Sequence, residues 1–187
     1  MKKRSSVLAL ALVLCAPLGA GAVEVAGVKV APTATVGGKT LKLNGAGVRK
    51  KVIVKVYVGA LYLESKSSDP AAIVAADTAR LVTMQFLRDV GKDKIIEAFS
   101  EGFDNNSPGT AAAAKAKLPA FAKVLPEELK EGQLLSISYE PGKGSTISVN
   151  GGATATVEGK PFAYALLLNY VGKDPADGDL KDGMLGK

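Results

Sequence analysis

The strongest pattern in the chain lies between residues 48 and 64, where apolar positions recur at every second residue. The apolar members of this series are Val52, Val54, Val56, Val58, Ala60 and Tyr62. The intervening positions are mixed, and their polar members are Arg49, Lys51, Lys55 and Tyr57. A period of two is typical of a β-strand with one face on the core. We therefore predict one long strand over 48–64, whose second face is either solvated or the polar wall of a cleft.

Shorter strands are expected on both sides of this segment. They cover residues 23–30, 34–43, 79–87, 134–139, 145–149 and 153–157. Glycines mark the turns within and between them, at Gly27, Gly37-Gly38, Gly142 and Gly151. Asn44 to Gly47 is expected as a glycine loop before the long strand.

Proline and glycine signals also delimit the helices. We predict helices at 70–76 after Asp69, at 92–103, from Gly109 behind a Ser107 cap to Pro119 and on to about 125, and at 162–171. Residues 179–181 provide one further turn. Strands in runs, followed by helices, favour an α+β fold in which helices cover one face of an antiparallel sheet.

The N-terminus has the three parts of a secretory signal. Met1 to Arg4 is basic, residues 5–18 are almost entirely apolar, and Ala20-Gly21-Ala22 has small residues where a signal peptidase reads them. We predict a signal peptide over 1–22 with cleavage after Ala22, a single domain over 23–187, and a periplasmic or secreted location. No later apolar run is long enough to span a bilayer.

Composition removes several classes of function. The chain has no His and no Trp, and its one Cys, Cys15, lies in the predicted signal. Histidine-based catalysis and histidine or thiolate metal centres are therefore excluded, and we expect no metal and no cofactor. The net charge of +6 falls to +3 without Lys2, Lys3 and Arg4. With no basic cluster that interleaves with aromatics, nucleic-acid binding is not expected.

Few polar residues are placed for chemistry. Asp89 is a lone acid beside Arg88, for which an ion pair or a helix cap is as good an explanation as catalysis. Arg49 and Tyr57 fall on one side of the predicted strand, above aliphatic residues. A guanidinium and a phenol suit an apolar ligand with one anionic head group. Lys51 and Lys55 lie between them and either assist or are solvated.

Two segments of this region resemble the chalcone isomerase family. Gly45-Ala46-Gly47-Val48-Arg49 is similar to the family's GAGxR motif, and 54–64, VKVYVGALYLE, is similar to the strand that follows it. Residues 85–90, QFLRDV, are similar to a third family segment, and the last strands and the last long helix fall in the expected order. The resemblance is closest to exported bacterial members. It implies an open-faced β-sandwich, in which a large antiparallel sheet is covered by a layer of helices.

The resemblance also implies candidate site residues. Plant chalcone isomerases use an Arg in GAGxR, a strand Thr, a Tyr and an Asn on a helix, and a Ser or Thr in the last helix. Arg49 matches, Tyr57 stands at the Thr position, Asn169 stands at the last-helix position, and residues 92–125 contain no tyrosine. Fatty-acid-binding members of the family keep the Arg and have a Tyr in the strand.

These correspondences favour one function and leave two alternatives open. The first is non-catalytic binding of a small amphipathic carboxylate such as a fatty acid, with Arg49, Tyr57, Asn169 and Lys55 as candidate ligand-binding residues. The second is an isomerase, an intramolecular lyase acting on a chalcone-like phenolic enone, in which Arg49 steers the anion. The third is an interaction module whose cleft is filled by its own side chains.

Overall fold

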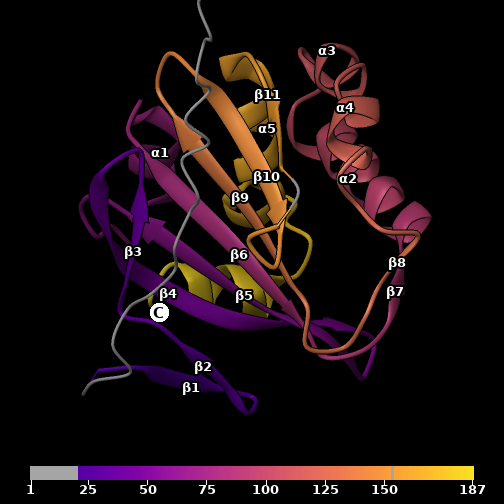
Figure 1. The fold of residues 1–187 in the computed structure, drawn as a ribbon. Coiled ribbons are helices and arrows are strands. Elements are labelled where there is room, and N and C mark those ends of the chain that lie inside the picture. The colour runs from indigo at the N-terminus through magenta and orange to yellow at the C-terminus, as the bar shows by residue number, and fades with distance from the viewer. Residues whose placement is uncertain (1–20, 153) are drawn as a thin grey trace, which may run out of the picture.

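A seven-stranded antiparallel sheet forms the body of the molecule (Figure 1). The computed structural model describes residues 21–152 and 154–187, so the predicted signal peptide lies, except for its last two residues, outside the described part. The strand order is β11-β10-β9-β6-β5-β4-β3. These strands are β3 (Thr33–Val36), β4 (Lys39–Lys51), β5 (Val54–Leu63), β6 (Arg80–Phe86), β9 (Leu134–Glu140), β10 (Gly144–Val149) and β11 (Thr154–Val157).

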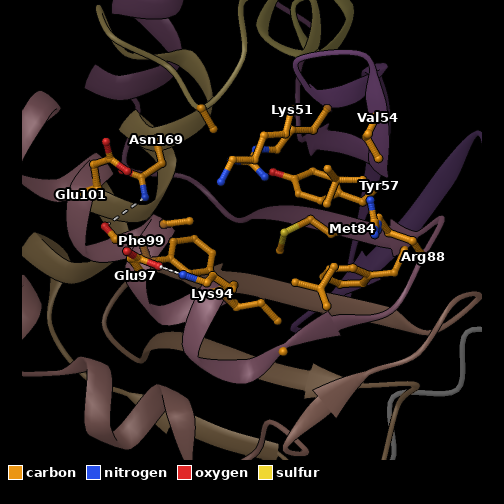
Figure 2. A pocket seen from close by; sticks show the side chains of 18 of the residues that line it. Lys51, Val54, Tyr57, Met84, Arg88, Lys94, Glu97, Phe99, Glu101 and Asn169 are labelled. Carbon is orange, nitrogen blue, oxygen red and sulfur yellow. Dashed lines mark hydrogen bonds and ion pairs between the residues drawn. The ribbon is translucent and has the colours of Figure 1, made fainter.

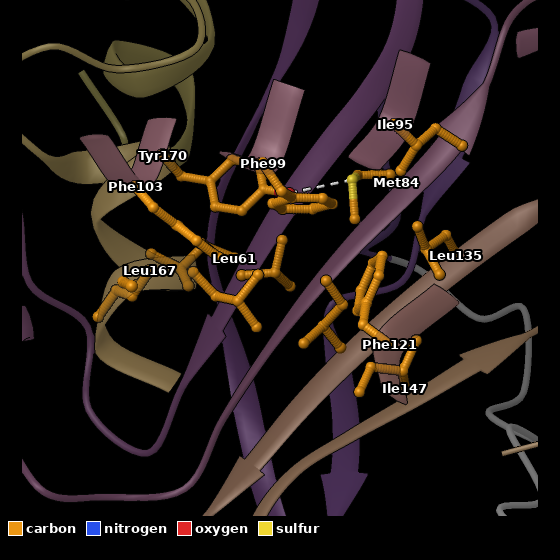
Figure 3. Close-up of a cluster of buried hydrophobic side chains, with 14 of the residues drawn as sticks. Leu61, Met84, Ile95, Phe99, Phe103, Phe121, Leu135, Ile147, Leu167 and Tyr170 are labelled. Atoms are coloured by element: carbon orange, nitrogen blue, oxygen red, sulfur yellow. Dashed lines mark hydrogen bonds between the residues drawn. The ribbon is translucent and has the colours of Figure 1, made fainter. Parts of the chain in front are cut away.

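Helices cover one face of this sheet, which confirms the predicted α+β architecture (Figure 1). They are α1 (Pro70–Ala75), α2 (Lys92–Asn106), α3 (Ala111–Lys115), α4 (Leu118–Ala122), α5 (Lys160–Val171) and α6 (Gly178–Met184). Two small hairpins complete the described part, namely β1 (Val23–Val25) with β2 (Val28–Val30) and β7 (Val90–Gly91) with β8 (Glu128–Leu129). Figure 3 shows Phe99 and Phe121 from the helices packed over the strand residues Leu61, Leu135 and Ile147.

The single strand predicted over 48–64 is wrong. The segment is a hairpin, in which β4 ends at Lys51 and β5 begins at Val54, with Val52 and Ile53 as the turn. Tight hairpin turns normally contain Gly, Asn or Asp, which tolerate a positive φ. Val52 adopts φ 60° although it is β-branched. Val52 and Ile53 carry no turn signal, so the period-two pattern runs through the turn and predicts one continuous strand.

The prediction that only one face of this segment packs on the core is also wrong. On β5, Tyr57, Leu61 and Leu63 belong to the main core beneath the helices. Val58, Ala60 and Tyr62 belong to a second apolar cluster on the opposite face, together with residues of β2, β3 and β4. The β1–β2 hairpin supplies Val28 and Val30 to this cluster, so even the open face of the sheet is partly covered.

The segment Asn44–Gly47 is not a loop but part of β4, next to a register shift between Leu43 and Gly45. Its glycines allow α6 to lie directly on the strand. A Cβ added at Gly45 would overlap the carbonyl oxygen of Gly183, and one at Gly47 would lie 3.1 Å from the Leu180 Cα. The helix α6 has seven residues and is longer than the single turn predicted over 179–181, and it packs directly on a strand that lacks side chains at the points of contact.

Helix capping agrees with the sequence in one case and differs in another. The Asp69 carboxylate accepts from the Ala71 N–H at 2.9 Å and caps α1 as predicted. Ser107 instead ends α2, where its N–H donates to the Phe103 carbonyl, and Thr110 begins α3. The strand meander and α5 are confirmed.

Candidate functional site

A cavity of about 450 Å³ lies between the sheet and helix α2 (Figure 2). Six residues from five elements define its inner wall. They are Arg49 on β4, Tyr57 on β5, Met84 and Phe86 on β6, Phe99 on α2 and Tyr170 on α5. Ligand pockets in proteins span roughly 300–1,000 Å³ and are mostly apolar with a few placed polar groups. The cavity has this size, and its lining combines apolar side chains with seven charged residues, namely Arg49, Lys51, Arg88, Asp89, Lys94, Glu97 and Glu101.

Arg49 and Tyr57 meet because β4 and β5 pair across the hairpin. The two residues are direct partners in the strand register, and the Arg49 guanidinium carbon lies 5.8 Å from the centroid of the Tyr57 ring. Among the described residues, no carboxylate forms an ion pair with Arg49. A half-buried guanidinium without a counter-ion, facing a cavity, is suited to an anionic ligand.

Tyr57 is a hydrogen-bond donor at neutral pH. Burial raises the pKa of its phenol to about 12, and the nearby Arg49 opposes that rise only in part. A protonated phenol beside a guanidinium offers a neutral donor and a charged donor to the same ligand group. The two side chains suit an oxyanion without requiring a proton transfer.

The apolar wall of the cavity comes mainly from residues that the sequence did not single out as site residues. The Tyr57 ring packs against Phe86 at 5.7 Å between centroids, and the Tyr170 hydroxyl donates to the Met84 sulfur at 3.0 Å. Met84 and Phe86 occupy alternate positions of a strand that was correctly predicted over 79–87. Their part in the site became visible only once β6 was paired with β5. Nothing in the sequence marked Tyr170 as a site residue, since it is one of many apolar residues in the helix α5.

Asn169 borders the cavity but is engaged in helix packing. Its amide nitrogen lies 3.5 Å from the Phe99 carbonyl oxygen. With the amide turned over, the nitrogen donates to the carbonyl oxygens of Gly102 at 3.1 Å and Ala165 at 3.2 Å. Either orientation ties α5 to α2. Gly102 permits this approach, because a Cβ there would lie 2.5 Å from the amide carbon.

Of the lysines predicted near the site, Lys51 borders the cavity and Lys55 does not. The hairpin turn explains this, because Lys55 faces Lys50 across the strands instead of standing between Arg49 and Tyr57. The rim also carries charged groups that already have partners. Lys94 pairs with Glu97 at 2.7 Å, and Asp89 pairs with Lys130 at 2.8 Å. Asp89 thus has the structural role that was weighed against catalysis.

The described residues contain no cluster of three acidic, histidine or cysteine side chains that could hold a metal ion. In the same part of the chain, no helix is long and apolar enough to cross a membrane.

The sequence profile of the chalcone isomerase-like family matches residues 22–186. The chain belongs to the chalcone isomerase-like family. Among solved structures, a fatty-acid binding protein from Arabidopsis thaliana has the same fold, with a TM-score of 0.67 at 15% sequence identity. The alignment covers 85% of this chain and 92% of the plant protein. A search of curated protein sequences found no match. The family fold, an open-faced sheet under helices, is the one predicted.

The buried tyrosines predict how this family member responds to alkaline pH. Burial raises the pKa of Tyr57, Tyr62 and Tyr139 to about 12 and that of Tyr170 well above its usual range. Between pH 10 and 12 the unfolded chain loses these protons while the folded protein keeps them, so the free energy of unfolding falls as pH rises. Below pH 10 this effect is absent. Tyrosinate absorbance and urea unfolding measure both quantities, and titration of these four tyrosines near pH 10 in the folded protein would contradict the prediction.

Proposed function

We propose that this chalcone isomerase-like protein binds a small amphipathic carboxylate such as a fatty acid and does not transform it. The observation that carries the proposal is the Arg49 guanidinium, which has no carboxylate partner among the described residues, beside the protonated Tyr57 at a cavity whose lining also includes apolar side chains from β5, β6 and α2. The carboxylate would accept from the guanidinium and the phenol. The acyl chain would lie against Phe86, Met84 and Phe99.

Burial of the acyl chain supplies the affinity in this arrangement. Each buried methylene contributes about 0.8 kcal/mol, so affinity rises with chain length until the cavity of about 450 Å³ is filled. The charge-assisted bonds to Arg49 fix the orientation of the head group and discriminate against uncharged lipids. The Arabidopsis neighbour supports the proposal, since it has this fold and is described as a fatty-acid binding protein.

Ligand analysis of the purified protein tests this function. Protein extracted without detergent is expected to release fatty acid on denaturation, as measured by mass spectrometry. After delipidation, affinity should rise from octanoic through dodecanoic acid and then level off, while the matching alcohols bind weakly. A delipidated protein with no affinity for any acid of the series would contradict the proposal.

The isomerase alternative has less support from the site. Arg49 is in place, but Tyr57 stands where the family enzymes have a Thr, and the Asn169 amide is engaged by backbone carbonyls of α2 and of its own helix. Removing one oxyanion-stabilising donor from an enzyme costs roughly 10²–10³-fold in rate. Chalcone cyclisation is therefore expected at the spontaneous rate. The interaction-module alternative is disfavoured, since the cavity is open and Arg49 forms no internal ion pair within the described residues.

We further propose that the protein acts in the periplasm or outside the cell. The proposal rests on the basic, apolar and small-residue segments of residues 1–22. Isolation from the periplasmic fraction of the source cells, with Val23 as the first residue, would support it. Recovery of the intact chain from the cytoplasm would contradict it.

A further inference from the structure

The turn between β4 and β5 exposes two large apolar side chains. Val52 is 91% exposed and Ile53 is 87% exposed, the most exposed large hydrophobic residues of the described part of the chain. Neither contributes to the two apolar clusters, and neither lines the cavity. Exposure of two adjacent β-branched residues at the tip of a hairpin stabilises nothing within the fold.

Turn chemistry does not explain these residues either. The other hairpins of the main sheet and the β1–β2 hairpin all place a glycine with positive φ in the turn, namely Gly27, Gly38, Gly142 and Gly151. At the β4–β5 turn, Val52 adopts φ 60° instead. A β-branched residue is disfavoured in this conformation, and a two-residue turn with a positive φ at its first position alone normally has Gly there. Val52 and Ile53 thus lower local stability, which points to a role outside folding.

The turn is surrounded by positive charge. Lys50, Lys51 and Lys55 flank it, and all three are exposed. Lys50 pairs with Asp179 at 3.0 Å, whereas Lys51 and Lys55 form no ion pair with any described residue. An apolar tip ringed by free lysines is complementary to an anionic lipid surface, where the tip enters the interface and the ammonium groups meet the phosphates.

The tip is continuous with the mouth of the cavity. Lys51 and Val54, the residues on either side of the turn, both border the cavity, and Figure 2 shows them beside Tyr57. A bilayer contacted by Val52 and Ile53 would therefore meet the protein at the cavity rim. An amphipathic ligand leaving the bilayer there has only a short path through water.

We propose that the β4–β5 tip, residues 50–55, docks on the surface of anionic phospholipid membranes. Val52 and Ile53 insert among the acyl chains near the headgroups, and Lys51 and Lys55 bind the anionic headgroups. This interaction is distinct from carboxylate binding in the cavity and does not require it.

A single tryptophan reports on the docking directly. The chain contains no Trp, so Ile53→Trp places one fluorophore at the tip. Its emission is expected to shift to the blue and to be shielded from aqueous quenchers when vesicles of phosphatidylglycerol and phosphatidylethanolamine are added. Phosphatidylcholine vesicles should have a much smaller effect, and added salt should reverse the shift. Thr35→Trp, at an exposed position of β3, is the matched control and should not respond.

Removal of the tip residues gives the second measurement. The double variant Val52→Gly, Ile53→Asn places Gly at the position with positive φ, so we expect it to fold at least as stably as the parent. Its partitioning onto the anionic vesicles should fall by about a hundredfold, since each buried aliphatic side chain is worth about tenfold. Lys51→Gln with Lys55→Gln should weaken partitioning by roughly tenfold or more. The control pair is Lys117→Gln with Lys123→Gln, at the exposed residues directly before and after α4, and it should leave the partitioning unchanged.

Three outcomes would overturn the proposal. One is an unchanged Ile53→Trp emission with anionic vesicles, and another is an equal response of Thr35→Trp. The third is a blue shift that grows with protein concentration without lipid, which would show that the tip binds a second copy of the chain. Fatty-acid titration of the Val52→Gly, Ile53→Asn variant in lipid-free buffer separates the two proposals, because a failure of membrane docking leaves that affinity in place.

Discussion

Replacement of Arg49 by alanine is expected to weaken fatty-acid binding by about a hundredfold, since loss of one partner of a desolvated, hydrogen-bonded charge pair costs roughly 2–5 kcal/mol. Arg49 is the direct cross-strand partner of Tyr57, and its guanidinium carbon lies 5.8 Å from the centroid of the Tyr57 ring. Isothermal titration of the delipidated protein measures the effect. Arg49→Lys should lose about tenfold, because an ammonium keeps the charge but lacks the two-pronged donor geometry.

The controls for Arg49 separate local from general effects of charge. Lys42→Ala removes one positive charge from an exposed position of the same strand and should leave the affinity unchanged. Tyr57→Phe removes only the phenol hydroxyl and should cost about tenfold, as expected for a hydrogen bond to a charged group. Lys55→Ala tests the lysine that the sequence suggested and that the structure places away from the cavity. An Arg49→Ala variant that binds like the parent would exclude the head-group role of this residue.

Replacement of Gly45 by valine is expected to destabilise the fold by about 3 kcal/mol, at the upper end of the range for an overpacked core. The new Cβ would overlap the Gly183 carbonyl and lie 2.8 Å from the Gly186 N, both of which are backbone atoms. No side-chain rotation relieves such a contact, so α6 must move off β4. Urea unfolding measures the loss, which in a chain of this size corresponds to a melting temperature lower by roughly 6–12 °C.

A glycine with open surroundings provides the comparison for Gly45. Gly109 has no atom within 4 Å of a built Cβ and has no positive φ, so Gly109→Ala should be neutral or slightly stabilising. The smaller change Gly47→Ala, where the nearest backbone atoms lie at 3.1 Å, should fall between the two. Equal stability of Gly45→Val and the parent protein would show that α6 does not depend on the bare strand.

The packing of Gly45 and Gly47 against α6 also explains why the segment 44–47 was wrongly predicted as a loop. Gly45 and Gly47 look like turn residues in a single sequence, because glycine is most often found where φ is positive or a loop is needed. In the structure both lie in β4, and neither has a positive φ. Their role is close packing against a helix more than 130 positions later, which no local pattern contains.

The candidate site was only partly predictable. The sequence points to Arg49 and Tyr57 because they are separated by an even number of residues in one predicted strand and so fall on the same face. The structure brings them together by another route, as partners on two strands joined by the Val52-Ile53 turn. The same turn places Lys55 away from the cavity, whereas Lys51 borders it as expected. The prediction that Arg49 and Tyr57 lie together holds although the single strand is wrong, because an antiparallel hairpin and a continuous strand can each place two residues on one face.

Local patterns determined the elements of this protein, while the contacts between elements required the tertiary structure. Period-two alternation, the Asp69-Pro70 start and the glycine turns predicted most strands and helices, because each of these signals acts within a few residues. The cavity, the wall formed by Met84 and Tyr170, the packing of α6 on β4 and the exposure of Val52 and Ile53 depend on strand pairing and helix docking. These arrangements are decided by which buried surfaces fit together across the whole chain, and a side chain's exposure or partner follows only from that fit.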